Sequence, residues 1–217
     1  MICLGPMGDP DPTDLINLET NRIPFKTANM NLDWSQTFRS SPSPTPGWRN
    51  WFRRMASLHQ TQWHAYYIGQ CITLSLSEMI KNEPMLTSAS YFWSDALNAF
   101  LFGHGLMTPT LLAVLMLTGL NVSTPDRSYD PLAKANSRFE TRKIAGWKGY
   151  IERYSKSGAT GHREHIAFLN MWLEKFIFCG KNVSPITNMQ RIAKLLASGN
   201  EVPLDQHLLG SVHSLLH

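Results

Sequence analysis

Residues His162 to His165 form the most metal-like group in the sequence, because they place two imidazoles and one carboxylate within a single helical turn. Zinc hydrolases commonly use the spacing His-Glu-x-x-His, which puts both histidine ligands on one helix face four residues apart. Here the histidines are three residues apart, and Glu164 directly precedes the second one. A solvated first helical turn, with Glu164 near the positive end of the helix dipole, explains this group better than a metal site.

No other group of side chains has the spacing of a known catalytic site. The sequence contains no Gly-x-Ser-x-Gly turn, no phosphate-binding loop and no Gly-x-Gly-x-x-Gly motif. Its three cysteines are far apart and form no Cys-x-x-Cys pair, which excludes a disulfide framework and an all-cysteine zinc site. We therefore predict that the chain is not an enzyme and has no catalytic, cofactor-binding or metal-binding residues.

Basic and aromatic side chains alternate between residues 48 and 54, where they could support binding. A helix would carry Trp48 and Trp51 on one face, with Arg49 and Arg53 on the opposite face. Such interleaving suits a nucleic-acid groove, in which bases stack on aromatic rings and arginines contact phosphates. The other interpretation places the aromatic rings in the core and the arginines in solvent. The net charge of +4 favours this second interpretation, since a nucleic-acid surface usually carries a larger basic excess.

The composition is that of one folded domain with an attached arm. The chain has 217 residues, of which 43% are hydrophobic and 17% charged, so it is too apolar for a disordered chain. Prolines are dense in residues 1–47, which we predict to be a flexible, poorly ordered arm. The most apolar stretch, Leu111–Leu117, is far too short to span a bilayer, so no membrane partner is expected.

Helical periodicity dominates from residue 48 onward, and no convincing strand pattern interrupts it. The first patterns begin at Trp48 and Ile68, and a third runs from Thr87 or Ser88 to Gly103. Further helices are predicted over residues 144–154, 162–178, 187–197 and 203–216. The sequence thus predicts an all-α fold, a single multi-helix orthogonal bundle over residues 48–217.

One further helix follows Thr108 and is expected to lie at the centre of the bundle, because residues 111–117 are apolar nearly all round. Thr108 is its predicted N-cap and Pro109 its first helical residue. Leu112 and Leu115 are predicted to be buried.

Trp172 and Lys175 lie beside the apolar stripe of the helix over 162–178. Trp172 is about 60° from that stripe, a position at which a large ring can be half exposed. Lys175 lies one turn further on, near the end of the helix, where a cation meets the helix dipole favourably. The pair is either a protein-interaction anchor or a core ring beside a helix-end charge.

Three ordered blocks resemble the plant mobile domain family. The first runs from Trp93 through Phe100 to Gly105-Leu-Met-Thr-Pro-Thr-Leu-Leu112 and Leu117-Thr-Gly-Leu120. The second is His165-Ile-Ala-Phe-Leu, continuing to Trp172-Leu-x-Lys175-Phe-Ile-Phe178. The third is Ala193-Lys-Leu-Leu-Ala197-Ser-Gly199 with Pro203-Leu204 after it. Ala113 stands where family members usually carry an acidic residue, and the chain ends where they usually continue, so it resembles a truncated member.

The resemblance implies a plant nuclear protein, related to proteins of meristem maintenance and transposable-element silencing, some of which work with a phosphatase-like partner. Members are often named aminotransferase-like, but a pyridoxal-phosphate enzyme needs a Schiff-base lysine, a phosphate loop and a partner for the pyridine nitrogen. No such set can be named here, so no cofactor is expected. We expect a non-enzymatic interaction domain; the alternative is a transposon-derived nucleic-acid-binding module using residues 48–54.

Overall fold

A computed structural model describes residues 43–80, 82, 85, 89, 92–102, 105–121, 144–155, 158, 160–179, 185 and 188–216. The helices are α3 (Trp48–Ala65), α4 (Gly69–Leu74), α6 (Leu111–Thr118), α7 (Gly146–Tyr154), α8 (His162–Trp172), α9 (Gln190–Ala197) and α10 (Leu204–Leu216). A π-helical turn, η2 (Leu173–Ile177), continues α8, and the strands are β1 (Trp93–Ser94), β2 (Ala99–Phe102) and β3 (Gly105–Met107). Most of the predicted arm, residues 1–42, lies outside the described residues.

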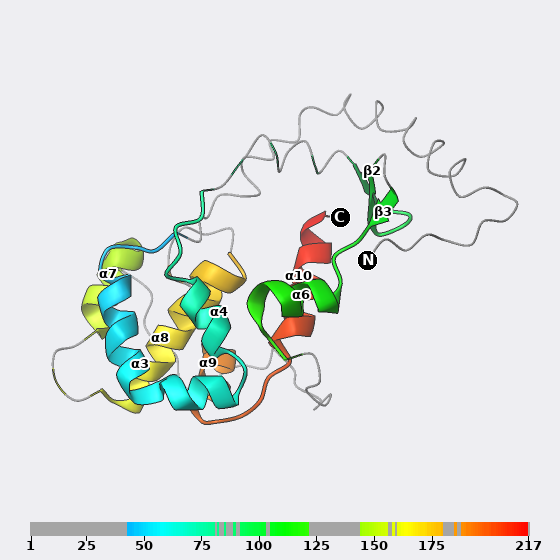
Figure 1. Cartoon of the computed structure of the whole chain (residues 1–217). Helices are drawn as coiled ribbons and strands as arrows, with labels where there is room; N and C mark the ends of the chain where they lie inside the picture. Colours follow the sequence, from blue (N-terminus) through cyan, green and yellow to red (C-terminus); the bar gives the residue numbers. More distant parts are fainter. Residues whose placement is uncertain are drawn as a thin grey trace, which may run out of the picture.

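The core lies where α3 crosses α8, with α7 and α9 packed against α8 (Figure 1). Phe168 is its centre: the Trp48 ring stacks on it at 4.6 Å, the Trp63 ring stacks at 5.3 Å, and Trp51 meets it edge-on at 5.4 Å between ring centroids. Each of these rings is almost completely buried. A buried aromatic ring stabilises a fold through a large apolar area and through ring geometry, so these four residues explain why α3 and α8 pack together.

The predictions for the helices after residue 144 are confirmed, because α7, α8 with η2, α9 and α10 cover the predicted ranges to within a few residues. Gly119 ends α6 with a φ of +73°, the left-handed conformation that favours glycine after a helix. The second helix is shorter than predicted: α4 ends at Leu74, and turns follow it where the periodicity continues to Ile80.

The all-α prediction is correct for most of the chain but misses a small antiparallel sheet in the order β1-β2-β3. Strands β1 and β2 and the turn between them stand over residues 93–102, where the periodicity predicts a helix. The chain reverses at residues 95–98, where Asn98 adopts a left-handed φ of +50°. A helix cannot continue through that conformation, and the aromatic residues on either side pair as strands instead.

The prediction for the fourth helix is wrong in its cap and its burial. Thr110, not Thr108, is the N-cap, and its side chain accepts a hydrogen bond from the Ala113 amide. The Thr108 hydroxyl donates to the Asn98 carbonyl instead. Among the described residues the helix packs mainly on α10 and α4, so Leu112 is exposed, Leu115 is half-buried and Val114 is buried. Figure 1 shows α6 beside α10, away from the place where α3 crosses α8.

Candidate interaction surface

Trp48 and Trp51 are core residues and do not offer their rings to a partner. Both indoles are buried against Phe168, and each indole N–H has an internal acceptor. Trp48 Nε1 donates to the Ser75 hydroxyl, and Trp51 Nε1 donates to Glu164, both at 3.0 Å. Their proposed role at an exposed surface is therefore wrong, because the helical stripe that carries them faces α8.

Arg49 and Arg53 lie on the outer face of α3, as the periodicity predicts, but each has a neighbour on the protein. Arg49 forms an ion pair with Glu78 at 3.1 Å, and Arg53 donates to the Asn50 side chain at 3.0 Å. Arg49 and Glu78 are both well exposed, so water and salt screen this pair. The structure thus separates the two arginines from the two tryptophans on opposite sides of one helix.

Trp172 is completely buried, so a half-exposed position is wrong for it. Lys175 lies in η2, the π-helical turn, with Nζ 5.4 Å from the centre of the Phe176 ring. Burial lowers the pKa of Lys175, while the nearby Cys179 thiol acts in the opposite direction. A π-helical turn shifts the register of the side chains that follow it. This shift applies to the residues after Leu173 and does not account for the burial of Trp172, which precedes the turn.

The group at the start of α8 is solvated only in part, as the sequence predicts for His162 and Arg163, which are exposed, but not for Glu164 and His165, which are buried. Glu164 is buried and accepts hydrogen bonds from Trp51 Nε1 and from the Arg54 guanidinium, both at 3.0 Å. Arg54 also donates to the Gly158 carbonyl at 2.9 Å. The carboxylate is thereby paired with a cation and an indole of α3, which compensates for the loss of water.

His165, the next residue, is buried and neutral. Trp63 Nε1 donates to His165 Nε2 at 3.0 Å, and the His59 ring stacks on the His165 ring at 3.7 Å. Burial lowers the pKa of His165 to about 3, with smaller contributions from His59 and His162. Within the described part of the chain, no three histidine, cysteine or carboxylate side chains are grouped so that they could hold a metal ion. Glu164 and His165 connect α8 to α3 through these hydrogen bonds.

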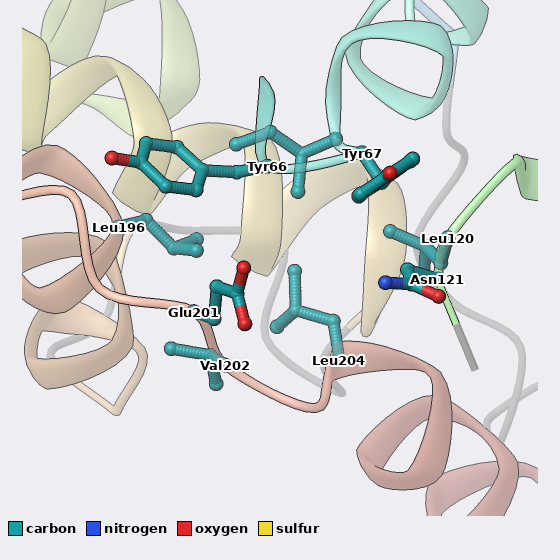
Figure 2. Close-up of a pocket in the computed structure, with 9 residues that line it drawn as sticks. Tyr66, Tyr67, Leu120, Asn121, Leu196, Glu201, Val202 and Leu204 are labelled. Carbon is teal, nitrogen blue, oxygen red and sulfur yellow. The ribbon is translucent and has the colours of Figure 1, made fainter. Parts of the chain in front are cut away.

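A small pocket lies between the α3–α4 turn, the end of α6 and the start of α10 (Figure 2). Tyr66, Tyr67 and Leu196 line it from one side, and Val202 and Leu204 from the other, with the Glu201 carboxylate pointing between them (Figure 2). The space open to the centre of a water molecule is about 10 Å³, which is room for one water. The pocket is thus too small for a cofactor.

The outer face of α6 is the most apolar exposed surface that the structure describes on a helix. We call it the α6 surface and define it by Leu112, Met116 and Leu117, which are 59%, 75% and 73% exposed. No charged residue occurs anywhere from Gly105 to Asn121. Exposed apolar residues grouped on one element commonly mark a site of protein association.

The sequence contains a signal for this surface that periodicity alone misreads. A helix that is apolar all round is either central or has a second partner that the chain does not supply. The sequence analysis predicts a central helix. Among the described residues, α10 and α4 are the main neighbours of α6, and Val114 is its buried residue. The two options could be separated only by knowing how many other elements surround α6.

Comparisons with known proteins identify one family. The family model described as plant mobile domain matches residues 67–216, which is about two thirds of the chain. No curated protein and no solved structure matches the chain significantly. Among the described residues, no helix is both long enough and apolar enough to cross a membrane. The matched range contains all three sequence blocks that carry the resemblance, and it extends from the α3–α4 turn to the end of α10. The chain belongs to the plant mobile domain family.

Proposed function

We propose that the chain is a non-enzymatic interaction module that binds a nuclear protein through the α6 surface. The observation that carries this proposal is the exposure of Leu112, Met116 and Leu117 on a helix without charged residues. Burying a large apolar side chain contributes about 1.5–3 kcal/mol, so three such residues can anchor an interface. They lie inside the segment that the family model matches.

Membership of the plant mobile domain family supports the biological setting of the proposal. By resemblance, the setting is the plant nucleus, in meristem maintenance and silencing of transposable elements. By the same resemblance, the partner is a phosphatase-like protein. The α6 surface supports a partner whose contact face is apolar and uncharged, because a charged group placed against it would lose its water without gaining a counter-ion.

The nucleic-acid alternative loses support at the segment on which it was based. Trp48 and Trp51 are buried and cannot stack on bases, and Arg54 is already paired with Glu164. Arg49 and Arg53 remain on the surface, but two arginines supply few of the phosphate contacts that nucleic-acid binding requires. The observations therefore favour a protein partner.

The test compares two substitutions of the same kind at equally exposed leucines. Leu112→Glu places a charge on the α6 surface, whereas Leu58→Glu places one on α3, where Leu58 is 60% exposed. Each variant is fused to a tag and recovered from plant nuclei, and co-purifying proteins are identified by mass spectrometry. We expect a phosphatase-like protein with the wild type and with Leu58→Glu, reduced at least about tenfold with Leu112→Glu. Equal recovery with both variants would contradict the role of the α6 surface.

A further inference from the structure

The hydrogen bonds of the small sheet fix which backbone groups face outward. The Leu101 amide donates to the Phe92 carbonyl at 2.8 Å, so the backbone groups of Leu101 point toward β1. Successive residues of a strand point their N–H and C=O groups to opposite sides, so Phe100 and Phe102 face β3. Their partners in the register are Met107 and Gly105. The N–H and C=O groups of Leu106, between these two, therefore point away from the sheet.

Among the described residues no strand pairs with the outer edge of β3, whereas the β1 edge of the sheet is buried. Leu106 and Met107 are 53% and 51% exposed, while Trp93 and Ser94 of β1 are buried. Natural sheets usually protect an open edge with a charged side chain, a proline or a bulge. Residues 105–107 contain no charge and no proline. Leu106 thus presents one N–H donor and one C=O acceptor beside an exposed apolar side chain.

We propose that β3 pairs with β3 of a second copy of this chain, antiparallel about a two-fold axis beside Leu106. In this register each Leu106 amide donates to the Leu106 carbonyl of the other copy, so one residue supplies both the donor and the acceptor. The sheet becomes a continuous six-stranded sheet across the two copies. Association of this kind goes beyond the proposed binding of a nuclear protein and does not depend on it.

Two features of the sequence favour a second copy as the occupant. A two-fold axis places identical residues close together, so any charge near the axis would face its own copy and repel it. No residue from 105 to 121 is charged, so none of these residues brings a like charge to the axis. The register also places Met107 opposite Gly105, and no atom lies within 4 Å of the position that a Cβ would occupy there. Each Met107 side chain can therefore lie across the glycine of the other copy.

A pairing of three residues is short, so the dimer is expected to be weak. Stable dimers bury about 800 Å² on each partner, which is more than one short strand supplies. We therefore expect a dissociation constant between about 10 μM and about 1 mM. The test is sedimentation equilibrium of the purified full chain across that concentration range. The weight-average mass should rise from the monomer value of 24.6 kDa toward twice that value.

Two lysine substitutions separate pairing at the edge from general apolar association. Leu106→Lys places like charges against each other across the two-fold axis and should keep the mass at the monomer value. Leu97→Lys is the matched control, because Leu97 is 50% exposed and lies in the turn between β1 and β2. It should associate like the wild type. Circular dichroism confirms that each variant is folded, and hydrogen exchange follows the Leu106 amide, which should become protected as association proceeds.

Three results would overturn the proposal. The first is a wild-type chain that stays monomeric at about 1 mM. In that case the edge of β3 would be expected to pair with a strand from another protein instead. The second is association of Leu106→Lys as strong as that of the wild type. The third is association without protection of the Leu106 amide. Leu112→Glu, the variant that tests the nuclear partner, should leave association through β3 unchanged, so the two proposals can fail separately.

Discussion

Of the two interpretations of Trp172, an interaction anchor or a core ring, its burial supports the core ring. Its ring is completely buried, and its indole N–H has no hydrogen-bond partner among the described residues. Trp172→Ala leaves a large cavity and should lower the free energy of unfolding by about 3–5 kcal/mol. Trp172→Phe keeps most of the ring and removes the unsatisfied donor, so its effect should be clearly smaller. Urea unfolding followed by circular dichroism measures both. Equal, small effects would show that the ring lies at the surface.

His165 should make the stability of the protein depend on pH. Its folded pKa of about 3 lies below its ordinary value of 6.5, so between these values the unfolded chain binds a proton that the folded chain does not. Stability is therefore complete above about pH 6.5 and falls as the pH is lowered toward 3, by at most about 1.4 kcal/mol per pH unit.

The measurement is urea unfolding of the wild type and of His165→Gln at about pH 7 and about pH 5. Glutamine can still accept the Trp63 hydrogen bond but does not titrate, so the variant should lose less stability between the two pH values. His59 and His162 lie near His165 and are present in both proteins, so the comparison isolates the change at residue 165. An identical loss in both proteins would show that His165 is not the group responsible.

The residues around Glu164 show what the sequence could not predict at this scale. A glutamate in the first turn of a helix favours the solvated position near the dipole, and that local rule is sound. The partners that bury Glu164 are Trp51 and Arg54, which precede it by 113 and 110 positions in the chain. No local pattern connects residues so far apart. The helix was therefore predictable and the environment of its polar residues was not.

Among the described helices, α6 has a side-chain N-cap and several exposed apolar residues, so its cap should matter for its stability. Thr110 has an extended backbone, and its hydroxyl accepts the Ala113 amide at 3.1 Å. Thr110→Ala should lower the free energy of unfolding by about 1 kcal/mol. Thr110→Ser keeps the capping hydroxyl and should lower the free energy of unfolding much less. Urea unfolding of the two variants beside the wild type tests this. If the serine variant loses as much free energy of unfolding as the alanine variant, the threonine methyl group rather than the hydroxyl cap is responsible.

The elements divide into those that periodicity predicts well and one that it does not. The helices after residue 144 have one apolar stripe that faces the core, so the pattern and the packing agree. Between Phe92 and Phe102 the apolar residues fit a helical spacing equally well, yet they form two strands. The turn at residues 95–98 decides between these structures, since Asn98 tolerates the left-handed conformation. Asn98 and Gly105 are residues typical of hairpin turns. The sequence prediction gives more weight to the helical spacing of the apolar residues and therefore misses the hairpin.

In the whole molecule, the family match begins after an element that the core requires. The matched range starts at residue 67, but α3 covers Trp48–Ala65 and supplies Trp48, Trp51 and Trp63 to the core. The same helix supplies the cation that pairs with Glu164. The folding unit is therefore longer than the segment by which the family is identified.

A fragment of residues 67–217 tests this conclusion. Without α3, Phe168 loses three stacked or edge-on rings, Glu164 loses its cation, and His165 loses its indole donor. Loss of one such buried ring alone costs about 3–5 kcal/mol, and typical domains are stable by only about 5–15 kcal/mol. The fragment should therefore lack the near-ultraviolet dichroism of packed aromatic rings and show no cooperative unfolding in urea.

A fragment of residues 43–217 is the control, because it retains α3 and the hydrogen bond from the Ser43 hydroxyl to the Met79 carbonyl. The described core begins at Trp48, so this fragment should unfold in urea at a midpoint close to that of the full chain. Cooperative unfolding of the 67–217 fragment at that same midpoint would contradict the prediction. It would mean that α8, α7 and α9 bury enough apolar surface among themselves, and that α3 covers their core without stabilising it.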